Sequence, residues 1–118
     1  MSVPELLHWQ WSGYPRYHQS RANLLIHIVV VPLFLAGNVT LVAALIEHSA
    51  TLAGFSLVAM AASVVLQGRG HRQEPIPPEP FTSRTNAVSR IFFEQWVTFP
   101  RFVMSGAWFR ALRQSGQP

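Results

Sequence analysis

Two long apolar runs dominate the pattern of hydrophobic and polar positions along the chain. The first covers residues 24–46, the second covers residues 50–67, and a short polar turn at 47–49 separates them. A helix needs about 20 residues, at roughly 1.5 Å each, to cross the hydrocarbon of a bilayer. The second run is rich in alanine, glycine and serine, which let two helices approach closely. Residues 24–67 are therefore predicted to form a transmembrane helical hairpin.

The arginines indicate how this hairpin is oriented. Arg16 and Arg21 precede it and Arg69 and Arg72 follow it, whereas the turn contains none. Because positively charged residues collect on the cytoplasmic side, both ends of the chain are expected in the cytoplasm. The alternative is a buried helical hairpin in a small soluble α domain. The near absence of a polar face in either run disfavours that alternative.

The segments outside the hairpin contain most of the helix-breaking residues. Residues 1–23 are expected to lie at the membrane interface, although their aromatic side chains would also suit the cover of a small core. These aromatics are Trp9, Trp11, Tyr14 and Tyr17. Residues 68–82 are predicted to form a site loop and a rigid proline-rich strap, because proline lacks an amide donor. Residues 83–113 are predicted to form two helices, parted near Pro100, that lie at the interface or enter the membrane partway.

Composition supports a membrane protein of the all-α class, with residues 1–118 forming a single domain. Hydrophobic residues make up 49% of the chain and charged residues 12%, whereas about 25% of the residues in typical soluble domains are charged. The positive charge comes from arginine alone, at the ends of the apolar runs, which suits lipid headgroups better than nucleic acid. The absence of cysteine excludes disulfides, thiolate-ligated zinc, iron–sulfur clusters and cysteine nucleophiles.

Histidines mark the open end of the predicted hairpin. His18 and His27 stand where the first apolar run begins, and His71 stands with Glu74 beyond the end of the second. A hairpin returns both places to the same side of the membrane, so that nitrogen and oxygen ligands for a metal ion would converge. His18 and His27 would lie on opposite sides of one straight helix. His18 is therefore expected in a loop before the helix, from which it folds back toward His27.

The two remaining histidines are predicted to stay apart from this site. His48 lies in the turn at the far end of the hairpin, about 30 Å away, and His8 lies in the interfacial segment. A single histidine is more often a hydrogen-bonded structural group than a ligand. The hairpin brings three histidines to one edge of the membrane. Placing ionisable residues there costs free energy, which favours a functional site over a structural one.

Two carboxylates are candidates to complete the site. Glu74 is followed at once by a proline, which favours the end of a helix there. Its role as a ligand, as a partner that orients an imidazole, or as a base stays open. Glu94 lies in the apolar block 92–96 and needs a polar partner. The simpler alternative for Glu94 is an ion pair with a nearby arginine, Arg90 or Arg101.

The order of these residues resembles a known family. His18, Asn23 and His27 stand at the start of the first apolar helix, which contains a proline, and the second apolar helix leads to Gly70-His71 and Glu74. This arrangement resembles the small membrane dioxygenases that α-oxidise 2-hydroxy fatty acids. That family is best known from the pathway that converts phytosphingosine to odd-chain fatty acids. The block 93–102 resembles its shorter prokaryotic members. The chain departs from the family pattern just before Glu74. Many members have one more residue between the Gly-His pair and the acidic residue, with an aromatic directly before that acidic residue, whereas here Gln73 precedes Glu74.

This resemblance implies an Fe(II) enzyme of a prokaryotic cell membrane that uses dioxygen, without a 2-oxo acid, to shorten a long-chain 2-hydroxy fatty acid by one carbon. Membrane lipid is then a further partner, and nucleic acid is not. The expected metal ligands are His18, His27 and His71, and the candidates for the catalytic carboxylate are Glu74 and Glu94. The candidates that would bind the substrate headgroup are Asn23, Arg21, Arg69 and Arg72. Each arginine is equally suited to anchor the chain at the membrane surface.

Two other functions stay open from the residues alone. In the first, His27 and His71 are the axial ligands of a haem in a non-catalytic or structural membrane subunit, which leaves His18 and Glu74 unexplained. In the second, the protein is a zinc-dependent membrane hydrolase, because the same nitrogen and oxygen ligands suit zinc. Glu74 or Glu94 would then be the base that acts on zinc-bound water.

Overall fold

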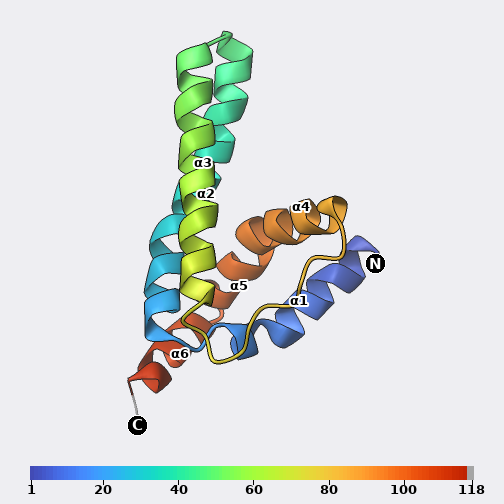
Figure 1. Ribbon diagram of the computed structural model, residues 1–118, viewed down its shortest axis with the longest axis vertical. Coiled ribbons are helices and arrows are strands. Elements are labelled where there is room, and N and C mark those ends of the chain that lie inside the picture. Colours follow the sequence, from blue (N-terminus) through green and yellow to red (C-terminus); the bar gives the residue numbers. More distant parts are fainter. Residues whose placement is uncertain (117–118) are drawn as a thin grey trace.

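Two long antiparallel helices form the longest part of the structure. The computed structural model describes residues 1–116, in which α2 (Arg21–Glu47) and α3 (Ala50–His71) lie side by side and the loop between them stands clear of the other elements (Figure 1). His48 has a left-handed backbone conformation with φ of 55°, and the Ser49 hydroxyl caps α3 by accepting from the amide of Leu52 at 3.1 Å. The predicted hairpin is therefore confirmed, and α3 continues past Gln67 to include His71.

Small residues determine how closely the two helices approach. A Cβ on Gly37 of α2 would lie 2.7 Å from Cγ of Met60 on α3, which is too close for a real contact. One turn further along, the hydroxyls of Thr40 and Ser56 are 2.6 Å apart. Near the open end, the Ser63 hydroxyl donates to the carbonyl of Val30. Close backbone approach and interhelical hydrogen bonds thus hold the hairpin together, as in membrane helix pairs.

The outer surface of the hairpin is strongly apolar. In the most hydrophobic stretch of each helix, only 28% of α2 and 17% of α3 is buried. A buried helix pair in a soluble domain would be mostly covered, and large side chains such as Val42, Ile46 and Phe55 would not be exposed as they are here. By length and composition both helices could cross a membrane. These surfaces indicate membrane association.

The N-terminal segment forms a single helix, α1 (Val3–Tyr17), which extends to one side of the open end of the hairpin and packs against the turn Glu94–Thr98 (Figure 1). Pro4 lies in its first turn, where a missing amide needs no partner. Leu6, Gln10 and Tyr14 recur at every fourth position and are buried. Tyr14 therefore belongs to the core and not to an interfacial belt. This agrees with the alternative interpretation, in which the aromatic side chains of this segment cover a small core.

The C-terminal part is helical across Pro100, where a break was predicted. The chain runs through α4 (Arg84–Phe93), the π-helical turn η1 (Glu94–Thr98) and α5 (Phe99–Met104) without interruption. The amide of Phe99 reaches back five residues to the carbonyl of Glu94, and Pro100 falls in the first turn of the next helix, so its missing donor disrupts nothing. The break lies instead at Gly106, whose φ of 85° turns the chain into α6 (Ala107–Ser115).

A strap of irregular chain, residues 72–83, connects α3 to α4 and passes alongside α1 (Figure 1). Its prolines exclude helix there, as predicted. Arg90 of α4 holds the strap by donating to the carbonyls of Glu79 at 2.8 Å and Pro80 at 3.1 Å. The strap therefore has a fixed path in spite of its lack of regular structure.

All remaining helices pack around the open end of the hairpin. The core there contains one or more residues from each of α1, α2, α5 and α6, namely Tyr14, Leu24, Val31, Phe99, Phe102 and Trp108. The indole of Trp108 also donates to the carbonyl of Leu24 at 3.1 Å, in the first turn of α2. Within the part of the chain that the structure describes, this core lies next to the ends of α2 and α3 that carry His27 and His71.

Candidate metal centre

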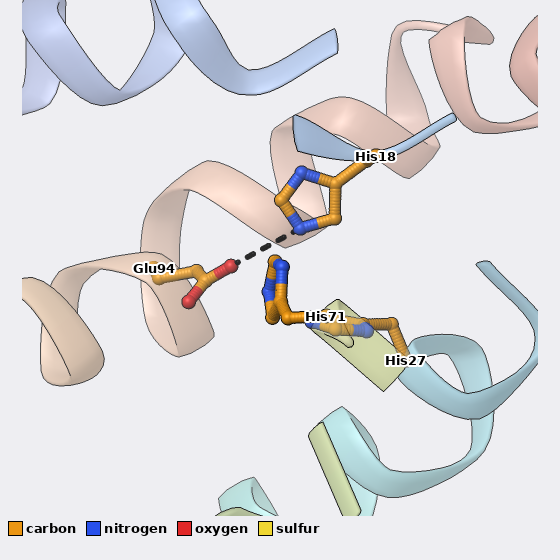
Figure 2. A group of neighbouring side chains, drawn as sticks. All are labelled: His18, His27, His71 and Glu94. Atoms are coloured by element: carbon orange, nitrogen blue, oxygen red, sulfur yellow. Dashed lines mark ion pairs between the residues drawn. The ribbon is translucent and has the colours of Figure 1, made fainter. Parts of the chain in front are cut away.

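Three imidazoles meet at the open end of the hairpin (Figure 2). His18 lies in the link between α1 and α2, His27 lies in the second turn of α2, and His71 is the last residue of α3. Their ring centroids form an almost equilateral triangle, with sides of 5.0, 4.9 and 5.0 Å, and the rings are nearly perpendicular to one another. His18 does fold back from a loop, as its spacing from His27 required.

The hydrogen bonds of the first two rings determine which nitrogen faces the centre. Nδ1 of His18 contacts the carbonyl of Tyr14 at 2.8 Å, and Nδ1 of His27 contacts that of Asn23 at 3.0 Å. Because a carbonyl can only accept, each Nδ1 carries a proton, and in the neutral imidazole each Nε2 then carries a lone pair. Metal-bound histidines are usually oriented by this kind of bond from the other ring nitrogen.

The inward nitrogens lack partners. Nε2 of His18, Nε2 of His27 and Nδ1 of His71 are buried and have no hydrogen-bond partner within residues 1–116. Burying a polar atom without a partner costs free energy, so three such atoms at one place require an explanation. A bound cation that accepts all three lone pairs would supply it.

Glu94 joins the three histidines from the first position of η1. Its Oε2 lies 3.5 Å from Nε2 of His18 and accepts from the hydroxyl of Tyr14 at 2.8 Å. Burial alone would raise the pKa of Glu94, but the interaction with His18 and with the other two imidazoles, when these rings carry positive charge, outweighs burial and holds the pKa at about 2. Burial and the charge of Glu94 raise the pKa of Tyr14, so its phenol stays a donor. A neutral Nε2 and a carboxylate that face each other at this distance repel, and a positive charge, on the ring or on a metal ion between them, would remove that repulsion.

The four residues fit a metal ion by their donor chemistry. His18, His27, His71 and Glu94 each offer one ligand atom, and all four atoms lie within 4.8 Å of one another. The set contains three imidazole nitrogens and one carboxylate oxygen, without sulfur. That combination suits iron, zinc and similar divalent ions.

Glu74 lies outside this group of four but lines the adjoining cavity. Its oxygens accept from the backbone amides of Gln19 at 2.8 Å and Ser20 at 3.0 Å, and from Nδ2 of Asn23 at 2.8 Å. These amides stand at the beginning of α2, where a helix has unpaired donors and favours negative charge. Glu74 therefore anchors the end of α3 to the start of α2 and orients His27 only indirectly, through Asn23.

The π turn explains why Glu94 reaches the site. Within η1 the register gains one residue, so Glu94 faces His18, Gln95 faces α3 and Thr98 faces α1. Turns of this kind are frequent at functional sites. The ion pairs considered for Glu94 do not form among the described residues, because Arg90 holds the strap and Arg101 lies over the ring of Trp11 at 3.9 Å.

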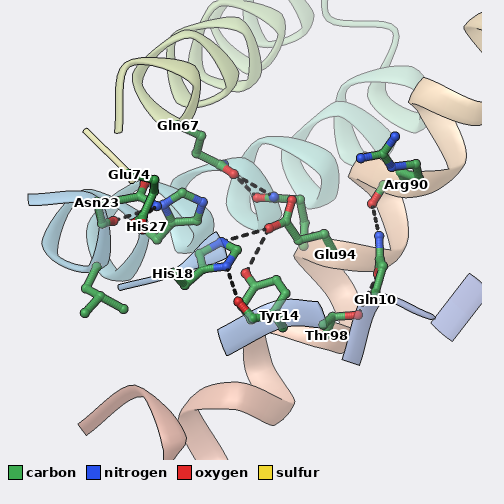
Figure 3. A network of polar contacts seen from close by, with 12 residues as sticks. Gln10, Tyr14, His18, Asn23, His27, Gln67, Glu74, Arg90, Glu94 and Thr98 are labelled. Atoms are coloured by element: carbon green, nitrogen blue, oxygen red, sulfur yellow. Dashed lines mark hydrogen bonds and ion pairs between the residues drawn. The ribbon is translucent and has the colours of Figure 1, made fainter. Parts of the chain in front are cut away.

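Buried amides connect η1 to its neighbours (Figure 3). Gln67 and Gln95 donate to each other at 2.8 Å in both directions, and Gln67 also donates to Ser63. On the other side, Thr98 donates to Gln10, which in turn donates to the carbonyl of Arg90 at 2.8 Å. These pairs fix the position of the turn that carries Glu94.

Sequence reasoning missed Gln10 and Tyr14 as parts of the site. Their signal was the spacing of Gln10, Tyr14 and His18 at every fourth position, which marks one face of a helix and its extension. Tyr14 contributes three contacts: its hydroxyl binds Glu94, its carbonyl binds His18, and its ring stacks on His18 with 3.7 Å between centroids.

A cavity of about 730 Å³ adjoins the site, between α1, α3, the strap and the α4–η1 segment. His18, His71 and Glu94 lie in its wall. Of the residues expected to bind a substrate headgroup, Arg72 alone lines this cavity, and Arg16 and Arg90, which were not proposed for that role, line it too. A ligand in the cavity would therefore meet both the histidine cluster and positive charge.

The other expected substrate-binding residues face elsewhere. Arg21 donates to the carbonyl of Leu112 in α6 at 3.3 Å. Asn23 is buried between Glu74 and Gly70. Arg69 is exposed outside the walls of this cavity. His48 and His8 are exposed and stand apart from the cluster, as expected.

No protein-family model, curated protein or solved structure matches this chain. The proposal of a function therefore starts from the geometry described above.

Proposed function

We propose that this protein is a membrane-bound Fe(II) dioxygenase that converts 2-hydroxy fatty acids to acids one carbon shorter. The observation that carries the proposal is the set of three unpartnered imidazole nitrogens that meet beside Glu94. His18, His27, His71 and Glu94 would hold the metal. When bound, the iron would supply the activation of dioxygen.

The geometry favours a single ion over haem. Axial ligands of a haem lie on opposite faces of a macrocycle. Here the His27 and His71 rings are 5.0 Å apart, and His18 lies within 5.0 Å of both. A porphyrin between His27 and His71 would collide with His18, so the haem-subunit alternative loses support.

The number of ligands favours iron over zinc. Four protein ligands close the tetrahedral shell that zinc prefers, whereas a catalytic zinc usually keeps three and a water. An ion with octahedral geometry keeps open positions beside the same four ligands, as non-haem iron oxygenases require. A 2-hydroxy acid can chelate such an ion through its carboxylate and its hydroxyl.

The chain itself would bind and orient the substrate. Arg16 and Arg72 in the cavity wall attract a carboxylate, while the buried Tyr14 keeps Glu94 in place. Glu94 contributes negative charge that partly offsets the charge of the ion. The stacked ring of Tyr14 and the packed ring of Phe102 on His18 limit access of water to this side of the cluster.

The proposed topology follows from the hairpin. We place α2 and α3 across a prokaryotic cell membrane, with the metal centre at its cytoplasmic edge. The start of α1 and the end of α6 lie in the half of the molecule away from the α2–α3 loop (Figure 1), which supports a shared side.

Product analysis tests this function. Protein loaded anaerobically with Fe(II) is given oxygen and 2-hydroxypalmitate, and mass spectrometry measures pentadecanoate. We expect conversion with Fe(II), and little with Zn(II) or with palmitate as substrate, since a site built around a hydroxyl rejects analogues that lack it by up to about 10⁴-fold. Equal conversion of both acids, or no conversion by iron-loaded protein, would contradict the proposal.

A further inference from the structure

Residues from α1, α3 and the α4–η1 segment line the cavity next to the metal centre, and those on α3 form a continuous stripe. On α3, Val64, Gln67, Gly68 and His71 follow one another at helical spacing and all line it. On α1, Gly13, Tyr14 and Tyr17 face them, and Ile91 and Glu94 complete the wall from α4 and η1. The stripe on α3 thus leads from an apolar residue to a histidine of the cluster.

Along the same stretch of α3 the exposed side chains change from apolar to charged. Val64, Val65 and Leu66 are exposed and apolar, whereas the next exposed charged residues are Arg69 and Arg72. Arginines that follow an apolar helix surface mark the level of the lipid headgroups. The cavity extends from Val64 to Arg72, so it spans that level.

From these observations we propose that a single-chain lipid enters the cavity sideways from the bilayer, between α3 and α4, with Gly68 at the threshold. The inference builds on the proposed function, because it assigns the path by which the acyl chain of the substrate reaches the metal centre. Val64 and His71 are seven residues apart, or about 10 Å along the helix axis. The carboxylate end would then lie near His71 and Arg72, while the chain trails past Val64 into the lipid.

Gly68 is suited to this position because it leaves the threshold open. A Cβ built on Gly68 meets no described atom within 4 Å, so a larger side chain there would extend into the opening and not against a neighbouring helix. Gly54, on the same helix toward the other end of the hairpin, also has free space around its Cβ but lies outside the cavity walls. The two glycines form a matched pair for substitution.

Photolabelling tests the path without requiring catalysis. The protein, in lipid nanodiscs and loaded with iron, is irradiated in the absence of oxygen with 2-hydroxypalmitic acid that carries a diazirine on its chain, and labelled peptides are identified by mass spectrometry. We expect labels on the cavity-lining residues of α1 and α4 in addition to those on the exposed faces of α2 and α3. Gly68→Phe should reduce the cavity labels by roughly tenfold or more, the scale on which even a one-methylene change in fit alters selection by an apolar pocket, whereas Gly54→Phe should leave them unchanged.

Labels on the exposed faces of the hairpin serve as the internal reference. Iron content and the circular dichroism spectrum report whether each variant is folded, and Gly68→Leu provides a smaller obstruction if Gly68→Phe does not fold. Undiminished cavity labelling in a folded Gly68 variant would overturn the proposal, as would labels confined to the outer faces in the unmodified protein. Normal turnover of 2-hydroxypalmitate by Gly68→Phe would reject the path but retain the enzyme, whereas normal labelling without any turnover would reject the enzyme but retain the path.

Discussion

The backbone of Gly70 lies directly against the side chain of Asn23, and a Cβ on Gly70 would collide with the Asn23 amide oxygen. This contact sets the distance between the end of α3 and the start of α2. Asn23 in turn donates to Glu74 and accepts from His27 through its carbonyl. The position of two of the three histidines therefore depends on a glycine that has no chemistry of its own.

Gly70→Ala should displace Asn23 and loosen this junction. We expect a loss of roughly 1–3 kcal/mol in stability, the usual cost of overpacking a buried contact, together with weaker metal binding. Thermal unfolding followed by circular dichroism measures the first effect and metal titration the second. Gly68→Ala, two residues earlier and in open space, is the control and should be at least as stable as the parent. Equal stability of the two variants would contradict the account of Gly70.

Alanine in place of His18, His27 or His71 should empty the metal site, because each removes one of the converging nitrogens. Mass spectrometry of the metal content in purified variants measures this. His48→Ala, at the far end of the hairpin, should retain the full content. A site that survives loss of any one of the three histidines, or that His48→Ala empties, would show that the cluster is not the metal centre.

The two carboxylates should respond in opposite ways to amide substitution. Glu94→Gln removes a charged ligand and should lower iron affinity while the fold persists. Glu74→Gln weakens charge-assisted bonds to the start of α2 and should cost about 1.5–3 kcal/mol of stability, with a smaller effect on affinity. Parallel metal titration and thermal unfolding distinguish the two outcomes, and reversed effects would exchange the roles assigned to these residues.

Tyr14→Phe should keep the ring stacked on His18 but free Glu94 from its hydrogen bond. Loss of a hydrogen bond that orients a metal ligand typically lowers metal affinity by about 10–100-fold, so we expect a decrease in that range with unchanged helix content. Tyr17→Phe is the matched control, because the Tyr17 hydroxyl makes only long contacts of 3.5 Å, to Glu79 in the strap and to the guanidinium of Arg16. An unaltered affinity in Tyr14→Phe would mean that this bond does not position Glu94.

The gathering of the three histidines could be predicted from the sequence, because the length of two apolar runs and the phase of a helix already determine it. The spacing of His18 and His27 requires a loop, and a hairpin returns His71 to the same end. The choice between Glu74 and Glu94 could not be predicted. It depends on the π turn before Pro100 and on unpaired amides at the start of α2, which are tertiary features.

The burial of Tyr14 and the break at Gly106 were missed for a related reason. A tyrosine near a membrane span has the same local signature at an interface and in a core, and only the packing of α5 and α6 against α1 separates the two. A proline breaks a helix when it lies in the helix interior, but it is tolerated in the first turn. Pro100 lies in the first turn of α5, and the sequence alone did not show that a new helix begins at Phe99.

X-ray absorption at the iron edge of anaerobically loaded protein tests the central claim most directly. A site made of His18, His27, His71 and Glu94 predicts a shell of nitrogen and oxygen atoms with the outer scattering of three imidazoles, without sulfur and without the pattern of a porphyrin. The imidazole contribution should decrease in any iron retained by His71→Ala and stay constant in His48→Ala. A porphyrin pattern, or an imidazole contribution that none of the three histidine substitutions lowers, would contradict the account.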